Sequence, residues 1–553
     1  MKIFYQIIIF SIVSLNLAFT QALITNTHNN KILQDEYSSI QESQVKVNLF
    51  YSPYLEKYKT EESKLNLFKR FDYKQYLVLK PVFAIRHSSN GFNMFSTNLL
   101  GKSSATWITP GIVIKSTIPI MSDYTNVWIY SWMNFYKHSA HGFNNLQTEV
   151  DDLYPLFNYN PEYSVNFYTS TKNEGNGIDF DESQAGISIL SSNFQFIFGQ
   201  FQTNIGPFYK GNLSISKNAP SFPQFILKGN YKEKLYFSYL IGSLNSNIST
   251  KYTLLENIYN VTRNDLYHDE WILSEINENE NTWYGAYSEI INNPDESSNI
   301  FERYVINHRL DILPNKKLRI GIYEQIIFGA KNPPLSYLIP INPFWSSQHA
   351  GNDLDNLQIG LDWEYYLNKY RIYGALMIDE WAPFDTFNDD ERNWFAYQFG
   401  FTRVLNMLDK NVMFKIEYSK IDPRAYTHRF IINQPKHNGY NLGYWTGNDS
   451  DDLFSNITVF LNDDSILKFE YQYSRIGDKN RRLDILEDQY DNNDIEFLGE
   501  DYTFIKTMAL SYSIKLKYFV FMDVEFKNYS TNLYSQTEDY DDVKIAFRYN
   551  INY

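Results

Sequence analysis

Apolar and polar residues follow a period of two along much of the chain from about Tyr76 onward. Phe194, Phe196 and Phe198, for example, are each separated by one residue. A period of two is that of a β-strand, in which successive side chains point to opposite faces. Together with β-branched and aromatic residues, it predicts strands at 76–85, 127–136, 194–198, 235–244, 318–328, 357–366, 370–378, 395–404, 412–418, 466–473, 508–516 and 519–526.

The connections between these predicted strands differ greatly in length. Clusters of Asn, Asp, Ser, Gly and Pro mark them, as at 388–390, 462–464 and 491–494. Some are very short and others span roughly 20 residues or more, which is typical of membrane β-barrels with short turns at one end and long loops at the other. The sequence has no fixed-period repeat, which argues against a propeller or a solenoid.

The last residues form the clearest single strand pattern. One face is apolar and consists of Val543, Ile545, Phe547, Tyr549, Ile551 and Tyr553, and the other consists of Lys544, Ala546, Arg548, Asn550 and Asn552. In a barrel the first face would meet lipid and the second the lumen. An edge strand of a soluble sandwich is the alternative, but a free edge at the terminus would invite aggregation. A terminal strand ending on an aromatic residue, here Tyr553, also resembles the signal read by the barrel-insertion machinery.

Residues 1–22 have the features of a secretory signal peptide. Lys2 provides a positive charge, residues 3–17 are mostly apolar, and Thr20 and Ala22 form a small-residue cleavage pattern. An uncleaved transmembrane helix or a buried helix is the alternative, but the apolar run is short and no basic cluster follows it. Residues 23–75 are expected to form a short periplasmic segment, partly helical near 55–70, or a disordered linker. The barrel itself is expected to span 76–553.

Composition narrows the class of protein further. No segment after the signal is apolar for long enough to form a membrane helix, so a membrane-embedded chain would have to close into a β-barrel. Cysteine is absent, which excludes thiol catalysis, iron–sulfur clusters and cysteine-based zinc sites. The net charge of -15 argues against nucleic acid as a partner. The aromatic content of 18 % fits two interfacial girdles, although sugar-binding proteins are also rich in aromatic residues.

Several stretches, taken in their order along the chain, resemble one family of proteins. They are Phe198-Gly199-Gln200, Gly206-Pro207, 213–223 (LSISKNAPSFP), 307–312 (NHRLDI), 318–324 (LRIGIYE), Phe328-Gly329, 341–344 (INPF), 373–381 (YGALMIDEW), 426–430 (YTHRF) and 439–453 (GYNLGYWTGNDSDDL). Over roughly residues 80–553 they resemble the capsule assembly protein Wzi family, in the variant common in Bacteroidetes-type bacteria. The resemblance implies an all-β fold, a transmembrane antiparallel β-barrel of roughly 18 strands in the outer membrane. It also implies a lectin-like role in holding capsular or other surface polysaccharide on the cell.

Two groups of acidic and aromatic residues could contact such a polysaccharide. The first follows a predicted strand and contains Asp379, Glu380, Trp381 and Asp385. A ring face can stack on a sugar while carboxylates accept hydrogen bonds from its hydroxyl groups. Glycosidases also use a pair of carboxylates, and a solvated strand end with an interfacial tryptophan is the third interpretation.

The second group lies within 440–452 and contains Tyr444, Trp445, Asp449, Asp451 and Asp452. We expect these residues on an outer loop, either simply solvated or in contact with polysaccharide. Clustered Asp and Asn oxygens could also hold Ca²⁺, but their spacing does not fit the helix–loop–helix calcium motif.

Charged residues also occur within the predicted strands, where facing lipid is costly. His308, Arg309 and Glu324 lie on neighbouring candidate strands, and His428 and Arg429 form a comparable pair. We expect all five to point into the lumen and to form a charge network there, with a structural or pore-narrowing role.

These observations predict a non-enzymatic outer-membrane barrel that binds and anchors surface polysaccharide during capsule assembly, with no cofactor and no metal. Its expected partners are the polysaccharide, outer-membrane lipid and the barrel-insertion machinery. Two alternatives remain, namely a porin-like barrel that transports solutes and a secreted glycoside hydrolase on a β scaffold. Conductance in a planar bilayer tests the first alternative, and activity on oligosaccharides tests the second.

Overall fold

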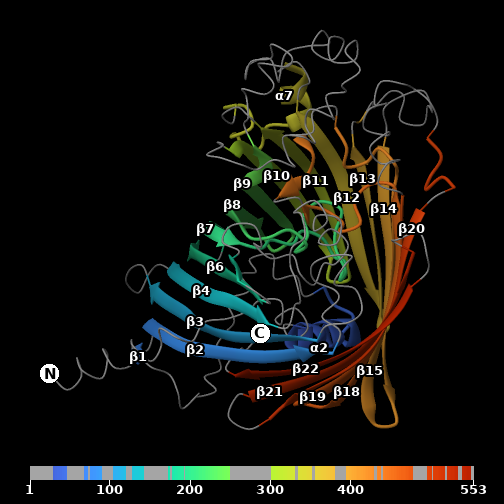
Figure 1. The fold of residues 1–553 in the computed structure, drawn as a ribbon. Coiled ribbons are helices and arrows are strands. Elements are labelled where there is room, and N and C mark those ends of the chain that lie inside the picture. The colour runs from blue at the N-terminus through green and yellow to red at the C-terminus, as the bar shows by residue number, and fades with distance from the viewer. Residues whose placement is uncertain are drawn as a thin grey trace.

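The computed structural model of this chain is built almost entirely of antiparallel β-strands (Figure 1). It describes residues 29–45, 68–72, 75–89, 104–119, 127–141, 172–174, 177–191, 193–249, 300–329, 334–350, 355–379, 381, 394–428, 433–437, 440–477, 495–500, 502–516, 520–532 and 538–549. The α-helices among these residues are α2 (Asn29–Gln41) and α7 (Phe344–Ala350). Neither of them is long and apolar enough to cross a membrane.

Within the described ranges, twenty strands join one sheet, and eighteen of them close into a ring. The short strands β1 (Phe68–Asp72) and β5 (Lys172–Glu174) each pair with a single neighbour and are not part of this circuit. Closure joins the last strand to the first, with Phe547 opposite Ile85. The ring strands follow chain order and are β2 (Gln75–Ser88), β3 (Ala105–Pro119), β4 (Trp128–His141), β6 (Gly177–Leu190), β7 (Phe194–Phe201), β8 (Phe222–Tyr231), β9 (Leu235–Ser249), β10 (Ile300–Asn315), β11 (Leu318–Gly329), β12 (Asn356–Leu367), β13 (Tyr370–Asp379), β14 (Trp394–Met407), β15 (Lys410–Ile421), β18 (Ser450–Asn462), β19 (Ser465–Gly477), β20 (Tyr502–Lys515), β21 (Val520–Thr531) and β22 (Glu538–Tyr549). The predicted antiparallel barrel of roughly 18 strands is confirmed.

The two ends of the ring differ, as the connection lengths predict. At one end, which we call the short-turn end, two-residue turns join β12 to β13 and β14 to β15. Their central residues Asn368, Lys369, Leu408 and Asp409 all have positive φ. This conformation lets a two-residue turn match the twist of antiparallel strands. The longer connections lie at the opposite end, which we call the long-loop end.

The last strand shows how the wall divides outside from inside. On β22 the apolar residues 543, 545 and 547 are 40–42 % exposed, and Lys544 and Arg548 on the alternate face are buried. Lys544 lies 3.2 Å from Glu525, and Arg548 lies 2.6 Å from Asp523. The predicted apolar outer face and polar lumen face are therefore confirmed for this strand. Its residues after Tyr549 lie outside the described part of the chain.

Helix α2 lies inside the ring at the short-turn end (Figure 1). Leu33, Tyr37 and Ile40 are buried and pack against lumen-facing side chains of the wall, namely Tyr366, Val404, Met413, Phe460 and Ile466. Just after the helix, the N–H of Val45 donates to the carbonyl oxygen of Lys316 in the turn between β10 and β11 (2.6 Å). Part of the expected periplasmic segment is thus a helix within the mouth of the barrel. Of the helix expected near 55–70, residues 55–67 lie outside the described residues and 68–70 belong to β1.

Two long connections fold into the ring, and we call them the inserted loops. The first is 202–221, between β7 and β8, and the second is 422–449, between β15 and β18, of which 422–428, 433–437 and 440–449 are described. They meet inside the ring, where the N–H of Ser216 donates to the oxygen of Leu442 (2.6 Å). The second loop also forms a small hairpin of β16 (Lys436–His437) and β17 (Tyr440–Asn441). The strands of the ring surround both loops (Figure 1).

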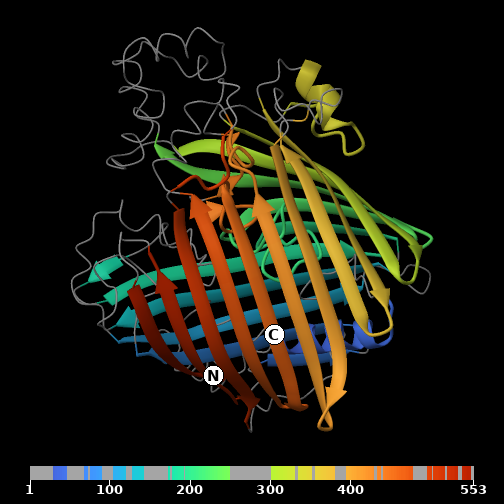
Figure 2. The same ribbon diagram turned by 90° about the vertical axis from the view of Figure 1, so that its right-hand side faces the viewer.

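The connection between β11 and β12 takes the opposite course. Its residues 334–350, which we call the outer-wall segment, include α7 and lie outside the ring (Figure 2). Tyr337 and Phe344 of this segment are buried against Ile326 and Phe328, which point outward from β11. The segment therefore covers part of the surface that simple alternation would assign to lipid.

Candidate functional site in the barrel interior

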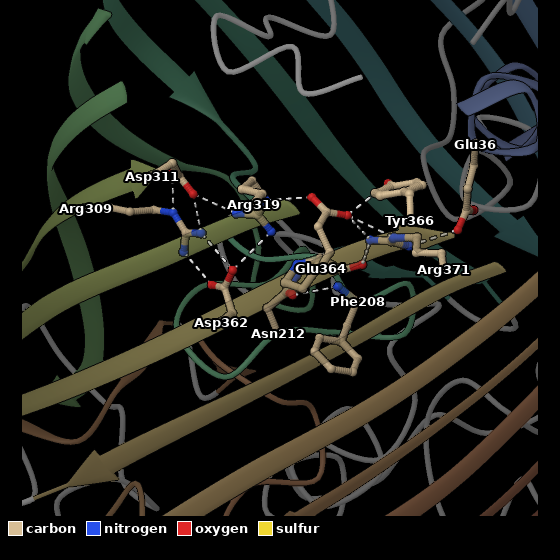
Figure 3. Close-up of polar contacts among 11 residues, drawn as sticks. Glu36, Phe208, Asn212, Arg309, Asp311, Arg319, Asp362, Glu364, Tyr366 and Arg371 are labelled. Carbon is tan, nitrogen blue, oxygen red and sulfur yellow. Dashed lines mark hydrogen bonds and ion pairs between the residues drawn. The ribbon is translucent and has the colours of Figure 1, made fainter. Parts of the chain in front are cut away.

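Eight charged side chains form a continuous ladder across the inner face of the wall. Figure 3 labels all of them except Lys415. They come from β10, β11, β12, β13, β15 and helix α2. Their charges are balanced, and the members of this charge ladder are Arg309, Arg319, Arg371 and Lys415 with Asp311, Asp362, Glu364 and Glu36. Each guanidinium faces at least two carboxylates, so no member carries a charge without a counter-charge beside it.

The centre of the charge ladder is Arg309, which lies in the lumen as expected from the sequence. It donates to both oxygens of Asp362 (2.6 and 2.8 Å) and to both oxygens of Asp311 (2.8 and 2.6 Å). Arg319 donates to Asp311 (2.7 Å) and to Glu364 (2.6 Å). None of these side chains is more than 7 % exposed. Buried charges of this kind are tolerated only when partners satisfy them with good geometry.

The charge ladder also ties helix α2 to the wall. Glu36 of the helix accepts hydrogen bonds from Arg371 (3.0 Å) and from Lys415 (2.9 Å). Burial alone would raise the pKa of Glu36, but the two cations outweigh it and hold that pKa below its ordinary value of 4.5. Glu36 is therefore ionised at neutral pH, and an ion pair adds to the apolar packing that holds α2 in the mouth of the barrel.

The same inner face fixes the first inserted loop. Glu417 of β15 accepts hydrogen bonds from the backbone N–H groups of Tyr209 (2.9 Å) and Lys210 (3.0 Å), and from the hydroxyl of Tyr373 (2.6 Å). The remaining guanidinium nitrogen of Arg371 donates to the carbonyl oxygen at position 207 (2.7 Å). Side chains of the wall thus take the place of water for backbone groups of the loop.

Asp379, expected to contact sugar, is fully buried at the end of β13. Its carboxylate accepts hydrogen bonds from the backbone N–H of Tyr426 (2.6 Å) and from the amide of Gln358 (3.1 Å). Tyr426 has a φ of 66°, a left-handed conformation that is costly for a residue with a side chain. Asp379 therefore positions the second inserted loop and does not face solvent.

Trp381, two residues further on, is 36 % exposed at the long-loop end. Among the described members of the two acidic and aromatic groups, it is the residue that a polymer outside the barrel could reach. Glu380 and Asp385 lie outside the described residues, as does Arg429 of the expected lumen network. His428 is buried in the second inserted loop.

The second acidic group is not a solvated loop cluster. Residues 450–452 begin strand β18, so consecutive side chains point to opposite faces. Asp452 points inward and accepts hydrogen bonds from the hydroxyls of Tyr444 and Ser474 (2.5 Å each). Asp451 points outward and pairs with Arg475 (2.6 Å). The expectation of an outer loop is wrong here because these residues pair with β15 and β19, despite a composition typical of turns.

Asp449 and Trp445 of this group are buried as well. The carboxylate of Asp449 accepts a hydrogen bond from the N–H of Leu498 (2.8 Å), and its backbone oxygen accepts one from Gly477 (2.8 Å). Trp445 belongs to an apolar cluster with Leu213, Met377, Trp394, Ile421 and Ile476, among others. Within the described part of the chain, no group of three or more His, Asp or Glu side chains is placed to hold a metal ion.

His308 and Glu324 point to the outside of the barrel and not into the lumen. Because Arg309 faces the lumen, the alternation of β10 turns His308 outward, and Glu324 is its direct partner on β11. The two side chains lie 2.8 Å apart, and the ring of Phe344 stacks on the imidazole with 4.1 Å between ring centroids. The expectation of a lumen position is wrong for this pair because the outer-wall segment shields it.

Of the members of the charge ladder, the sequence patterns predict only Arg309 as a lumen residue. A usable signal is present, since charged residues occur at like-facing positions i and i+2 within a strand, as at Arg309 and Asp311 or Asp362 and Glu364, and residues of opposite charge occur on the neighbouring strands. The residues that such a search would have found are Asp311, Arg319, Asp362, Glu364 and Arg371.

A buried histidine makes the second inserted loop sensitive to acid. Burial and the nearby Arg303 guanidinium lower the pKa of His437 from 6.5 to about 3. The docked loop therefore holds a neutral imidazole, and its stabilisation is complete above pH 6.5 and is lost as the pH falls toward 3. By about pH 4.5 the docking equilibrium should weaken by up to about a hundredfold.

Hydrogen-exchange protection factors of residues 433–437 and 440–449 measure this effect. Protection should fall between neutral pH and about pH 4.5 in the wild-type protein and should stay nearly constant in His437→Gln. An equal fall in both proteins would show that another group is responsible.

Comparison with known proteins places the chain in a family. The family model described as capsule assembly protein Wzi matches residues 136–542. Similar solved structures include Wzi from Escherichia coli, described as an outer membrane protein involved in group 1 capsule assembly and a carbohydrate-binding β-barrel (12% identity, 85% of this chain and 83% of that chain, TM-score 0.47). Others are OccK7 (OpdD) from Pseudomonas aeruginosa (8% identity, 86% and 98%, TM-score 0.40) and OccAB4 from Acinetobacter baumannii (10% identity, 86% and 97%, TM-score 0.42). No curated protein matches the chain.

The matched region contains both inserted loops and all members of the charge ladder except Glu36, and it covers well over half of the chain. This chain therefore belongs to the capsule assembly protein Wzi family.

Proposed function

We propose that this protein binds surface polysaccharide and anchors it to the cell during capsule assembly. The observation that carries the proposal is that both inserted loops, which contain much of the family's sequence pattern, bond to each other and to the lumen wall. A lumen occupied by the protein's own chain supports anchoring better than the passage of solutes. The Escherichia coli Wzi is itself described as a carbohydrate-binding β-barrel involved in capsule assembly.

The barrel is placed in the outer membrane by its family and by its closed ring with an apolar outer face. In such barrels the short turns face the periplasm and the long loops face the outside. Helix α2 then occupies the periplasmic mouth. We further propose that residues 1–22 direct export and that the terminal strand, ending at Tyr553, is read by the barrel-insertion machinery.

The proposed contact surface lies at the long-loop end, around Trp381. The partly exposed indole offers a face for stacking on a sugar ring, and the neighbouring Glu380 and Asp385 add hydrogen-bond acceptors. One such contact is weak, but a polymer engages many copies of the barrel at once, so avidity holds it. Tyr444 is buried and donates a hydrogen bond to Asp452, so its group is not part of the proposed contact surface.

We infer that the protein is not an enzyme. The carboxylate of Asp379 is bonded to a backbone N–H and to a side-chain amide and has no exposed surface. Asp449 and Asp452 are likewise buried and occupied by donors from the protein. Incubation of oligosaccharides with the purified protein should give no cleavage product, and cleavage that disappears in Glu380→Gln would overturn the inference.

Trp381→Ala should weaken polysaccharide binding by purified barrel by about tenfold, since truncation of a central tryptophan commonly removes more than about 1 kcal/mol. Tyr231→Ala is the matched control, because Tyr231 is an exposed aromatic residue (60 %) at the opposite end.

In cells, deletion of the whole gene should shift polysaccharide from the cell surface to the medium. Unchanged retention in the deletion strain would refute the anchoring role.

Planar-bilayer recording separates anchoring from transport. A lumen filled by the inserted loops should give no steady open-channel current from the wild-type protein. Steady conductance at all tested voltages would favour the transport alternative.

A further inference from the structure

The outer-wall segment lies on the face of the ring that meets the membrane. Leu310 and Ile322 are exposed outer-face residues of β10 and β11, at 38 % and 44 %. Ile326 shares the face of Ile322 because the two are four residues apart on the same strand. Tyr337 and Phe344 bury Ile326 together with outward residues of β9 to β12, namely Tyr239, Ile306, Phe328 and Leu357.

Two polar groups of the wall beneath the segment bond to the backbone of the segment. The carboxylate of Glu324 accepts a hydrogen bond from the backbone N–H of Phe344 (2.7 Å) in addition to its contact with His308. The hydroxyl of Tyr239 donates to the carbonyl oxygen of Tyr337 (2.9 Å). Without the segment, an acidic residue and a histidine would face outward on neighbouring strands.

The depth of this pair locates the segment relative to the membrane. Glu324 is the seventh of the 12 residues of β11, so it lies near the middle of its strand. A strand crosses the hydrocarbon layer with about 9–11 residues. Glu324 is therefore at the depth of the hydrocarbon, and the chain that covers it must lie at the same depth.

The opposite side of the segment is apolar and exposed. Leu335 and Ile341 are each 80 % exposed, and Ile339 is 51 % exposed. Residues 333–348 contain no Asp, Glu, Lys or Arg, although these types make up 20% of the chain. The side chain of Asn342 is bonded within the segment, to the carbonyl oxygen of Ser336 (3.1 Å) and to Ser347 (2.6 Å). Ser346 and His349, both in α7, are exposed polar residues, whereas the exposed side chains of 335–341 are all apolar. An uncharged, apolar surface of this kind is suited to hydrocarbon and not to water.

We propose that the outer-wall segment is embedded in the membrane and that its exposed side chains bind the acyl chains of the outer leaflet. The segment replaces the strand surface of β9 to β12 as the lipid contact of the barrel and seals the His308–Glu324 pair from hydrocarbon. The proposal rests on the outer-membrane placement and is independent of polysaccharide anchoring. The apolar surface of the outer-wall segment is continuous with the outer face of the ring, which meets lipid. We therefore expect lipid, and not a protein partner, to cover this surface.

The absence of cysteine makes a direct test possible, because any introduced thiol is unique. Ile341→Cys is labelled with an environment-sensitive fluorophore, and the barrel is reconstituted in phosphatidylcholine vesicles with and without nitroxide-labelled lipid. Leu361→Cys, on the outer face of β12, is the lipid-facing reference, and Leu408→Cys, in a short turn, is the water-facing reference. The label at 341 should be quenched by nitroxide lipid within about twofold of the label at 361 and should resist aqueous iodide.

Two labelling results would contradict the proposed lipid contact of the outer-wall segment. Strong iodide quenching with little lipid quenching, as expected at 408, would place the segment in water and overturn the proposal. Protection from both quenchers that increases with the protein-to-lipid ratio would indicate contact with a second copy and would also overturn it. Heat-modifiable gel mobility verifies that each variant is folded, and Leu335→Cys serves if Ile341→Cys does not fold. Polysaccharide binding by the labelled protein reports separately on the anchoring role.

Discussion

Replacing Asp362 with leucine is expected to lower the free energy of unfolding of the barrel by about 3–5 kcal/mol. Asp362 accepts hydrogen bonds from Arg309 at 2.6 and 2.8 Å and lies 3.0 Å from Arg319. Both guanidiniums are nearly inaccessible to water, at 5–6 % exposure. The substitution leaves two buried cations to share the remaining carboxylates, and the cost of an uncompensated buried charge exceeds the gain from apolar packing.

Urea unfolding of the refolded protein in detergent micelles measures this loss. Asp464→Leu is the control, since Asp464 is 61 % exposed in a turn and lies 3.9 Å from Lys515. An exposed pair of this kind contributes about 0–1 kcal/mol. Equal effects of the two substitutions would mean that water reaches the charge ladder and screens it.

The wall of the barrel is predictable because alternation is a local property. On β22 each side chain is assigned to lipid or lumen by its own position, and the structure agrees at positions 543 to 548. Other strands lack a clear pattern. β3 contains Pro110, and β6 contains a polar run and Gly186, whose missing side chain leaves room for Trp132. In a closed ring both neighbours supply hydrogen bonds, so strand formation tolerates poor local propensity.

The interior is less predictable because it depends on where long connections go. Asp379 and Asp452 resemble surface acids in the sequence, yet both serve as acceptors for the second inserted loop. Only the path of residues 422–449 into the ring decides between these roles. His308 illustrates the reverse case, since a connection that folds outward makes a polar pair acceptable on the outer face.

Helix α2 has a helical pattern of apolar residues in the sequence, but this pattern lies within a polar, charged stretch and is easily missed. Leu33, Tyr37 and Ile40 are spaced by four and three residues, which places them on one face of a helix. Glu36 and Tyr37 then lie next to each other at the lumen wall, one paired with cations and one in the apolar cluster. A polar segment with one apolar stripe is what a helix needs to dock in a partly polar lumen.

Glu36→Lys is expected to release helix α2 from the mouth of the barrel. The substitution places a third cation beside Arg371 and Lys415, which now lie 3.0 and 2.9 Å from the carboxylate. Loss of a buried pair costs about 3–5 kcal/mol, so the fraction of undocked helix should rise by at least about a hundredfold. The wall should remain folded, because its strands are paired independently of α2.

Thiol labelling at Ser39→Cys reports this release, since Ser39 is 6 % exposed in the docked helix. Labelling should accelerate strongly when Glu36→Lys is added, less with Glu36→Gln, and hardly at all with Glu42→Lys. Glu42→Lys is the control because it changes an exposed residue just after the helix by the same charge.

The pH dependence of helix α2 should differ from that of the second inserted loop. Because the pKa of Glu36 is lowered, the stabilisation that Glu36 contributes is complete above pH 4.5 and is lost only as the pH falls through the lower pKa of the folded state. Exchange protection of residues 29–45 should therefore persist in the range in which the His437 loop already loosens. Simultaneous loss of protection in helix α2 and in the second inserted loop would show that the two open as one unit and that Glu36 does not hold the helix independently.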